Sequence, residues 1–190
     1  MHYNLKLDMR VIAGDAKGKR LKTPKGSIRP TTELVRGAIF SIVQPLIVEE
    51  GRVLDLFAGS GALGIEALSR GAGWVDFVES NARHCTVIKE NLEITGFASR
   101  GKVHCISVEK AMAVLDGPYD LITLDPPYEH SFTVEIMTSL VNSRLVDSSS
   151  VIVIEYSCHH ALPPKLGRFS LYKDKQYGDT CVSIYRQEVT

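Results

Sequence analysis

The stretch Val-Leu-Asp-Leu-Phe-Ala-Gly-Ser-Gly-Ala-Leu-Gly, residues 53–64, decides the fold class of this chain. An apolar run with a single acid, Asp55, leads into Gly59, Gly61 and Gly64, and more apolar residues follow. This order is typical of a buried β-strand that turns tightly through glycines into a helix. In a parallel sheet such a turn lies at the carboxyl ends of the strands, where ligands bind. The stretch therefore predicts an α/β fold with a ligand-binding loop.

Strand and helix patterns alternate after this stretch. Buried apolar strands that alternate with helices indicate a mostly parallel, doubly wound sheet covered on both faces. We expect strands over residues 53–57, 74–78, 103–106, 119–124 and 151–154, helices over 62–70, 82–94 and 131–142, and a hairpin over 169–185.

The glycine loop suits an anion, because the first N–H groups of a helix have no partner within it. The anion could be a pyrophosphate or the carboxylate of a methionine moiety. Asp55 favours the second, since a carboxylate repels phosphate but can hold an ammonium group. Glu79, about twenty residues further on, suits a ribose diol or is an ordinary acidic strand end. The expected cofactor is S-adenosyl-L-methionine, with candidate loop residues Asp55, Ala58, Gly59, Ser60 and Gly61.

A second motif, Asp125-Pro126-Pro127-Tyr128, follows the strand expected over 119–124. The two prolines restrict the backbone and hold a carboxylate, a carbonyl oxygen and an aromatic ring together. Asp125 and the Pro126 carbonyl can each accept one N–H of an exocyclic base amine, while Tyr128 stacks on the base. The motif predicts methylation of a base amine, mainly by positioning, with Asp125, Pro126 and Tyr128 as catalytic residues. The alternative is a proline-rich turn with an incidental tyrosine.

Positive charge gathers near the amino terminus. Residues 1–36 carry nine Lys/Arg and three Asp/Glu, although the chain as a whole has no net charge. A basic segment on an acidic remainder suits a phosphate-rich partner; the alternative is a solvated basic surface. The candidate RNA-binding residues are Lys19, Arg20, Arg29 and Arg36.

The same segment has its own structural pattern. Short β-capable runs at 10–13 and 19–22 predict a hairpin, and Thr31 or Thr32 can cap a helix that stops before Pro45. We expect residues 1–50 to form a basic hairpin and helix packed on a methyltransferase domain over 51–190. The expected apolar face of the helix comprises Leu34, Val35, Ala38, Ile39, Ile42 and Val43.

The cysteines Cys85, Cys105, Cys158 and Cys181 are scattered without a C-x-x-C pair, so we expect no disulfide framework. The run 158–160, Cys-His-His, is interpreted as incidental polar residues, and no metal is expected. No apolar run approaches the roughly 20 residues that span a bilayer, and residues 1–8 lack a signal-peptide core. We expect a cytoplasmic monomer, with Met9 as a possible native start.

Taken together, five segments of this sequence resemble the RsmD family, bacterial 16S rRNA (guanine-N2)-methyltransferases. The resemblance runs from about Met9 to Arg186, and its motifs come in the family's order. The first and last segments matter most, because the two central motifs occur in many amino-methyltransferases. The segments are Met9–Gly14, Arg29–Thr32, Asp55–Gly61, Asp125–Tyr128 and Tyr177–Thr180.

The resemblance implies a Rossmann-like class I methyltransferase fold, with a seven-stranded sheet and a small N-terminal β-hairpin. It implies that the substrate is 16S rRNA in an assembled or assembling small ribosomal subunit. It assigns Asp55, Gly59 and Gly61 to the cofactor loop, Glu79 to the ribose, and residues 125–128 to the reacting amine. The adenine contact falls at Ser107 and Val108, through Ser107 or a backbone group, where many such enzymes have an acidic or amide side chain.

Two other functions remain open. An adenine-N6 methyltransferase acting on DNA or RNA would use the same four-residue motif, although the sequence has no obvious appended DNA-recognition domain. A nicotinamide-dependent oxidoreductase or a non-catalytic nucleotide-binding module would share the glycine loop alone.

Overall fold

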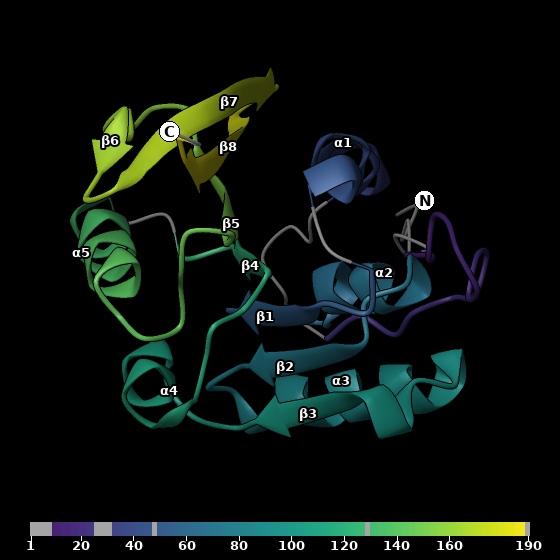
Figure 1. Ribbon diagram of the computed structural model, residues 1–190. Helices are drawn as coiled ribbons and strands as arrows, with labels where there is room; N and C mark the ends of the chain where they lie inside the picture. Colours follow the sequence, from purple (N-terminus) through teal and green to yellow (C-terminus); the bar gives the residue numbers. More distant parts are fainter. Residues whose placement is uncertain (1–8, 25–31, 47–48, 128–129, 189–190) are drawn as a thin grey trace, which may run out of the picture.

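An eight-stranded sheet forms the centre of the molecule, with the strand order β3-β2-β1-β4-β5-β8-β7-β6 (Figure 1). The computed structural model describes residues 9–24, 32–46, 49–127 and 130–188. Tyr128, Arg29 and Thr31 lie outside these residues. The order places β1 beside β4, so the chain reverses its direction of travel across the sheet between them. Ligands of doubly wound sheets bind at the carboxyl ends of the strands beside such a reversal.

The first five strands are parallel, and the last three continue the sheet with antiparallel pairs. The largely apolar sequences of β1, β2, β4 and β5 suit central strands that are buried on both faces, whereas β7 is polar and mostly exposed. The strands are β1 Arg52–Leu56, β2 Trp74–Val78, β3 Gly101–His104, β4 Leu121–Leu124, β5 Val151–Ser157, β6 Lys165–Leu166, β7 Phe169–Tyr177 and β8 Thr180–Gln187.

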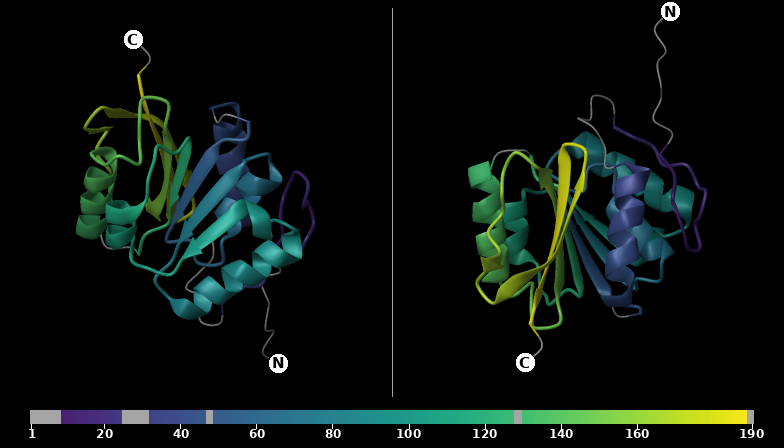
Figure 2. Two further views of the ribbon diagram at one scale, coloured as in Figure 1. Left: turned by 60° about the horizontal axis from the view of Figure 1, so that its bottom comes forward. Right: turned by 90° about the horizontal axis from the view of Figure 1, so that it is seen from above.

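Helices cover both faces of the sheet and create two cores (Figure 2). Successive strand residues point to opposite faces, so Val53 packs with α1, α2 and α3, whereas Leu54 packs with α4 and α5. The helices are α1 Glu33–Val43, α2 Ala62–Ser69, α3 Ala82–Thr95, α4 Val108–Val114 and α5 His130–Val141, with short 3₁₀ turns at Gln44–Leu46 and Ala98–Arg100.

The N-terminal hairpin is narrower than two full strands. It has one β-bridge, Arg10 with Arg20, flanked by backbone hydrogen bonds such as Leu21 N to Met9 O at 2.8 Å. The Glu66 carboxylate of α2 accepts the backbone N–H groups of residues 12 and 13. Met9 and Leu21 are buried in the core that α1, α2 and α3 share. The hairpin is therefore attached to the sheet through α2.

The helix predicted before Pro45 is α1, and Thr32 is its cap: the Thr32 hydroxyl accepts the N–H of Val35 at 3.3 Å. One expected core position is wrong. Leu34 is 71% exposed, because the buried face follows Val35, Ile39 and Val43 instead.

The expected α/β fold with a mostly parallel, doubly wound sheet is confirmed, with three differences in detail. The sheet has eight strands rather than seven, because the two-residue β6 adds to its edge. β3 begins at Gly101, before the apolar run that predicted it, since Gly101 and Lys102 already pair with β2. α4 was not predicted; its seven residues are too few to show a helical period.

No disulfide framework is expected from the scattered cysteines, but two of them are bonded to each other. Cys158 and Cys181 form a disulfide across 23 residues of sequence. Antiparallel pairing of β5 with β8 brings them together, since Ser157 pairs with Thr180 immediately beside them. The spacing of the cysteines does not mark this pair, because the contact depends on the tertiary pairing of two strands. Cys85 and Cys105 are free.

Candidate active site

The glycine loop connects β1 to α2 with a backbone that side chains would disturb. Gly59 and Gly61 have φ angles of 55° and 77°, in the left-handed region that favours glycine. Gly61 is the N-cap of α2 and has no side chain, so no capping side chain occupies the first N–H groups of this helix. Gly64 lies against the sheet, where a Cβ would come within 2.3 Å of Phe77 Cε1. Turn and close packing thus both depend on glycine here.

Asp55 ties this loop to β4. Its carboxylate accepts the Gly64 N–H at 3.0 Å through Oδ2 and the Thr123 hydroxyl at 2.8 Å through Oδ1. The side chain is buried, and burial raises the pKa of Asp55 to about 7 against the lowering effect of the two hydrogen bonds. In this arrangement Asp55 positions the loop, a part that its sequence position did not reveal.

Glu79 lies at the loop, as the spacing predicted. It follows β2, and its Oε2 accepts the Gly59 N–H at 2.9 Å while Oε1 accepts the Asn81 N–H at 2.8 Å. The adjacent backbone is also fixed, because Ala58 N–H donates to the Val78 carbonyl at 3.0 Å. A carboxylate joined to a glycine loop in this way is placed to accept hydroxyl groups of a ligand bound there.

Ser60 faces the protein interior. It is 8% exposed, its hydroxyl lies 3.5 Å from Met9 Sδ, and its carbonyl accepts the Asn91 side-chain amide at 2.9 Å. The structure therefore gives Ser60 a part in anchoring the loop to α3 and the N-terminal hairpin.

Ser107 and Val108 lie beyond the carboxyl end of β3. Ser107 caps α4 by accepting the Lys110 N–H at 3.4 Å, and Val108 is buried in the core beneath α4. The end of β3 is close to Glu79, whose N–H donates to the His104 carbonyl at 3.1 Å. Both residues are thus near the cofactor loop. The Ser107 side chain, however, caps α4, and the Val108 side chain packs in the core.

Asp125 and Pro126 follow β4 directly, at the same end of the sheet. Thr123, which hydrogen-bonds Asp55, is two residues before Asp125, so the loop after β1 and the motif after β4 are joined through one hydroxyl. Asp125 is partly exposed and Pro126 is buried. Tyr128, the third catalytic candidate, lies outside the described residues.

The predicted RNA-binding residues do not form one group. Lys19 and Arg20 are exposed on the hairpin, and Lys19 Nζ also donates to the carbonyls of residues 94 and 95 at the end of α3. The prediction that Arg36 binds RNA is wrong. Arg36 is fully buried on the inner face of α1, and its guanidinium donates to the Arg10 carbonyl. Burial lowers the pKa of Arg36, which the carboxylates of Glu66 and Glu33 partly offset. Arg29 lies outside the described residues.

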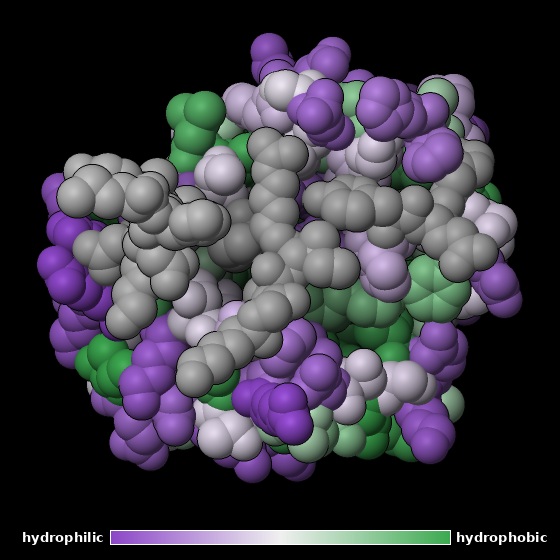
Figure 3. Space-filling model, turned by 180° about the vertical axis from the view of Figure 1, so that it is seen from behind, coloured by the Kyte–Doolittle hydropathy of each residue, from purple (hydrophilic) through white to green (hydrophobic). Residues whose placement is uncertain are grey.

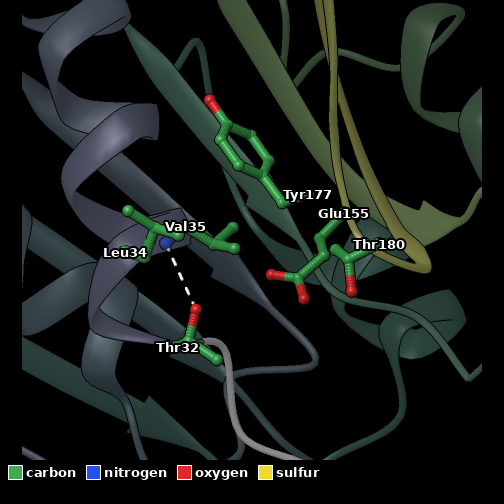
Figure 4. Close-up of a pocket in the computed structure, with 7 residues that line it drawn as sticks. Thr32, Leu34, Val35, Glu155, Tyr177 and Thr180 are labelled. Carbon is green, nitrogen blue, oxygen red and sulfur yellow. Dashed lines mark hydrogen bonds between the residues drawn. The ribbon is translucent and has the colours of Figure 1, made fainter.

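A cavity of about 310 Å³ opens between α1, β5 and the turn from β7 to β8 (Figure 4). Its lining includes Thr32, Glu155, Tyr177 and Thr180. Sequence reasoning missed Glu155, which is 4% exposed. The signal was present, since Glu155 interrupts an apolar strand near its carboxyl end as Asp55 does.

In the described part of the chain, no group of three or more His, Cys, Asp or Glu side chains could hold a metal ion. None of the described helices is long and apolar enough to cross a membrane.

Figure 3 shows the surface of the molecule from behind. Hydrophilic residues gather toward the edges of this face, and hydrophobic residues lie between them.

Comparison with known proteins places these features in a family. The family described as "Conserved hypothetical protein 95" matches residues 9–186. YlbH of Bacillus subtilis (strain 168) is 36% identical over 94% of this chain and 99% of its own length. "Ribosomal RNA small subunit methyltransferase D" of Escherichia coli (strain K12) is 30% identical over 95% of this chain and 90% of its own length. The solved structure of yhhF from Escherichia coli superposes with a TM-score of 0.85 at 30% identity, covering 96% of this chain and 99% of that one.

Proposed function

This chain belongs to the RsmD family, and on that premise we propose that it methylates the exocyclic N2 amine of one guanine in 16S rRNA of the small ribosomal subunit, using S-adenosyl-L-methionine. One observation carries the proposal. The glycine loop after β1 and the Asp125-Pro126 motif after β4 are joined through the hydrogen bond of Asp55 with Thr123. A cofactor loop and an amine-binding motif therefore lie at neighbouring strand ends, as methyl transfer requires.

The residues of the loop fit the cofactor. A Cβ at Gly59 would meet only the Phe57 carbonyl at 3.9 Å, so that side of the loop is open to a ligand. The Gly59–Gly61 backbone would hold the methionine moiety and Glu79 the ribose hydroxyls, while Asp55 holds the loop in place. When bound, S-adenosyl-L-methionine supplies an electrophilic methyl group. The adenine is assigned to the region of Ser107 and Val108.

The amine is positioned by the chain's own acceptors. The Asp125 carboxylate and the Pro126 carbonyl each accept one N–H, which directs the nitrogen lone pair toward the methyl group. Tyr128 stacks on the base. Positive charge that develops on the nitrogen is stabilised by the carboxylate, and the methylated nitrogen then releases one proton to solvent, so no general base is needed.

The substrate is RNA within an assembled or assembling particle, and the enzyme acts as a cytoplasmic monomer. Lys19 and Arg20 on the hairpin, with Arg29, extend the phosphate-binding surface. Residues 1–50 supply this surface, and residues 51–190 supply the methyltransferase domain.

The assay combines purified protein, methyl-labelled S-adenosyl-L-methionine and small-subunit particles from cells that lack the enzyme, followed by digestion of the rRNA to nucleosides. Label in N2-methylguanosine is expected. Label in N6-methyladenosine would favour the adenine-N6 alternative, and no transfer would refute the proposal. A folded Asp125→Ala variant that still binds the cofactor is the control and should transfer no label.

A further inference from the structure

The cavity in Figure 4 is built from segments that are far apart in the sequence. Thr32 comes from the cap of α1, Glu155 from β5, and Tyr177 and Thr180 from the turn between β7 and β8. Thr32 and the turn between β7 and β8 belong to two motifs of the sequence, Arg29–Thr32 and Tyr177–Thr180. Neither motif is part of the cofactor loop or of the Asp125 motif. Figure 4 shows the Glu155 carboxylate directed between Thr32 and Thr180.

Strand register places this cavity beside the catalytic motif. Leu124, the last residue of β4, pairs with Ile154 of β5, so Asp125 and Glu155 each come one residue after this last pair. Neighbouring strands are about 4.8 Å apart, so the two acids follow adjacent backbone positions at the carboxyl end of the sheet. Thr123 pairs with Val153, so Glu155 also lies on the face of the sheet that carries Asp55 and Thr123.

The size and lining of the cavity suit a single extruded base. Its volume, about 310 Å³, is at the lower end of the roughly 300–1,000 Å³ found for small-ligand pockets. Tyr177 offers an aromatic ring at the wall, and Leu34 is 71% exposed at the edge. Aromatic and apolar groups of this kind stack on bases taken out of an RNA strand. Leu34 takes no part in the core, and its exposed side chain is available to contact a base in this cavity.

The chemistry of Glu155 selects one base. An ionised carboxylate only accepts hydrogen bonds, and the Watson–Crick edge of guanine presents the N1–H donor next to the N2 amine. Adenine has an acceptor nitrogen at N1, which a carboxylate would repel. Asp125 and the Pro126 carbonyl accept the two hydrogens of the amine. Glu155, a second acid on the next strand, can then accept a hydrogen bond from the neighbouring N1–H.

We propose that Glu155 accepts the N1–H of the target guanine and makes the enzyme specific for guanine over other purines. This inference rests on the proposed function and names the residue that sets its base specificity. Glu155 would be a specificity-determining residue distinct from Asp125, which acts on the amine that is methylated.

The test uses particles reconstituted with 2-aminopurine in place of the target guanine. 2-Aminopurine keeps the 2-amine but lacks the N1–H. The wild-type enzyme should prefer guanine in kcat/KM by about 10- to 100-fold, the contribution of one hydrogen bond to a charged group. Glu155→Ala should bring this ratio close to one by losing activity on guanine, and Glu155→Gln should reduce it several-fold. Glu93→Gln, at an exposed acid of α3, should leave it unchanged.

The outcomes separate the two claims. Guanine methylation by the wild type with an unchanged guanine to 2-aminopurine ratio in both Glu155 variants would overturn the inference alone. Failure of the wild type to methylate guanine would overturn the proposed function. If Glu155→Ala does not fold, the ratio for Glu155→Gln decides, and cofactor affinity equal to wild type confirms that this variant keeps an intact loop.

Discussion

At the scale of single residues, Asp55 is the buried acid that joins the glycine loop to β4. Its carboxylate accepts the Gly64 N–H of α2 through one oxygen and the Thr123 hydroxyl of β4 through the other. The protonation state of this one side chain is therefore coupled to the folding of the sheet.

The raised pKa of Asp55 gives a stability prediction. Its folded-state pKa of about 7 is above the value near 3.9 expected in the unfolded chain, so the folded state holds its proton over a wider pH range. The stabilisation is fully present below pH 4 and is lost as pH rises through 7, by at most about 4 kcal/mol. Between pH 5 and pH 8, the free energy of unfolding measured by chemical denaturation should therefore decrease more for the wild type than for Asp55→Asn. Equal decreases would show that Asp55 titrates normally.

Glu79 gives a binding prediction. Replacing it with alanine removes the acceptor expected for the ribose hydroxyls, so affinity for S-adenosyl-L-methionine should fall by about 1.5–3 kcal/mol. Titration calorimetry on the folded variant measures this, with Glu93→Ala as the matched control on an exposed acid. An unchanged affinity for Glu79→Ala would remove this residue from the site.

At the scale of elements, the strongly patterned parts of the chain were predictable. The β1–loop–α2 unit follows from its apolar strand and three glycines, and α1 follows from its cap and apolar period. Short elements were not, because α4 and β6 are fixed by tertiary contacts. Arg36 was misplaced for a related reason: it shares the helical face of Phe40 and Val43, a spacing that its charge obscured.

Packing of α2 on the sheet gives a test with an internal control. Gly64→Ala would place a Cβ 2.3 Å from Phe77 and should destabilise the protein by about 1–3 kcal/mol, the usual cost of overpacking. Gly37→Ala in α1 would meet nothing closer than Ile12 Cδ1 at 3.9 Å and should stabilise by about 0.5–1 kcal/mol. Denaturant midpoints measure both. Similar effects of the two changes would contradict the close contact at Gly64.

At the scale of the whole molecule, charge and catalytic groups are separated along the chain and brought together by the sheet. The basic hairpin is attached to α2 and α3, next to the glycine loop. Four acids lie near or just beyond the carboxyl ends of β1, β2, β4 and β5, namely Asp55, Glu79, Asp125 and Glu155. Three of these acids were identified from motifs. The fourth, Glu155, has no recognisable motif around it; it interrupts an apolar strand, and its place beside β4 makes it a candidate.

The hairpin predicts a salt dependence. If Lys19 and Arg20 contact phosphates, the slope of log affinity for small-subunit particles against log salt should flatten by about two when both become glutamine. Binding across a salt series measures the slope, with Lys173→Gln on β7 as the control. Lys19 also caps α3, so unfolding must be measured in parallel to separate lost stability from lost contacts. An unchanged slope would show that the hairpin does not touch RNA.

The central claim is that this chain methylates one guanine of small-subunit rRNA. Mass spectrometry of 16S rRNA from cells that lack the gene tests it most directly, with the gene restored as wild type or as Asp125→Ala. The account predicts that a single N2-methylguanosine disappears on deletion, returns with wild type and stays absent with Asp125→Ala. An unchanged set of 16S modifications, or loss of a methyladenosine instead, would contradict it.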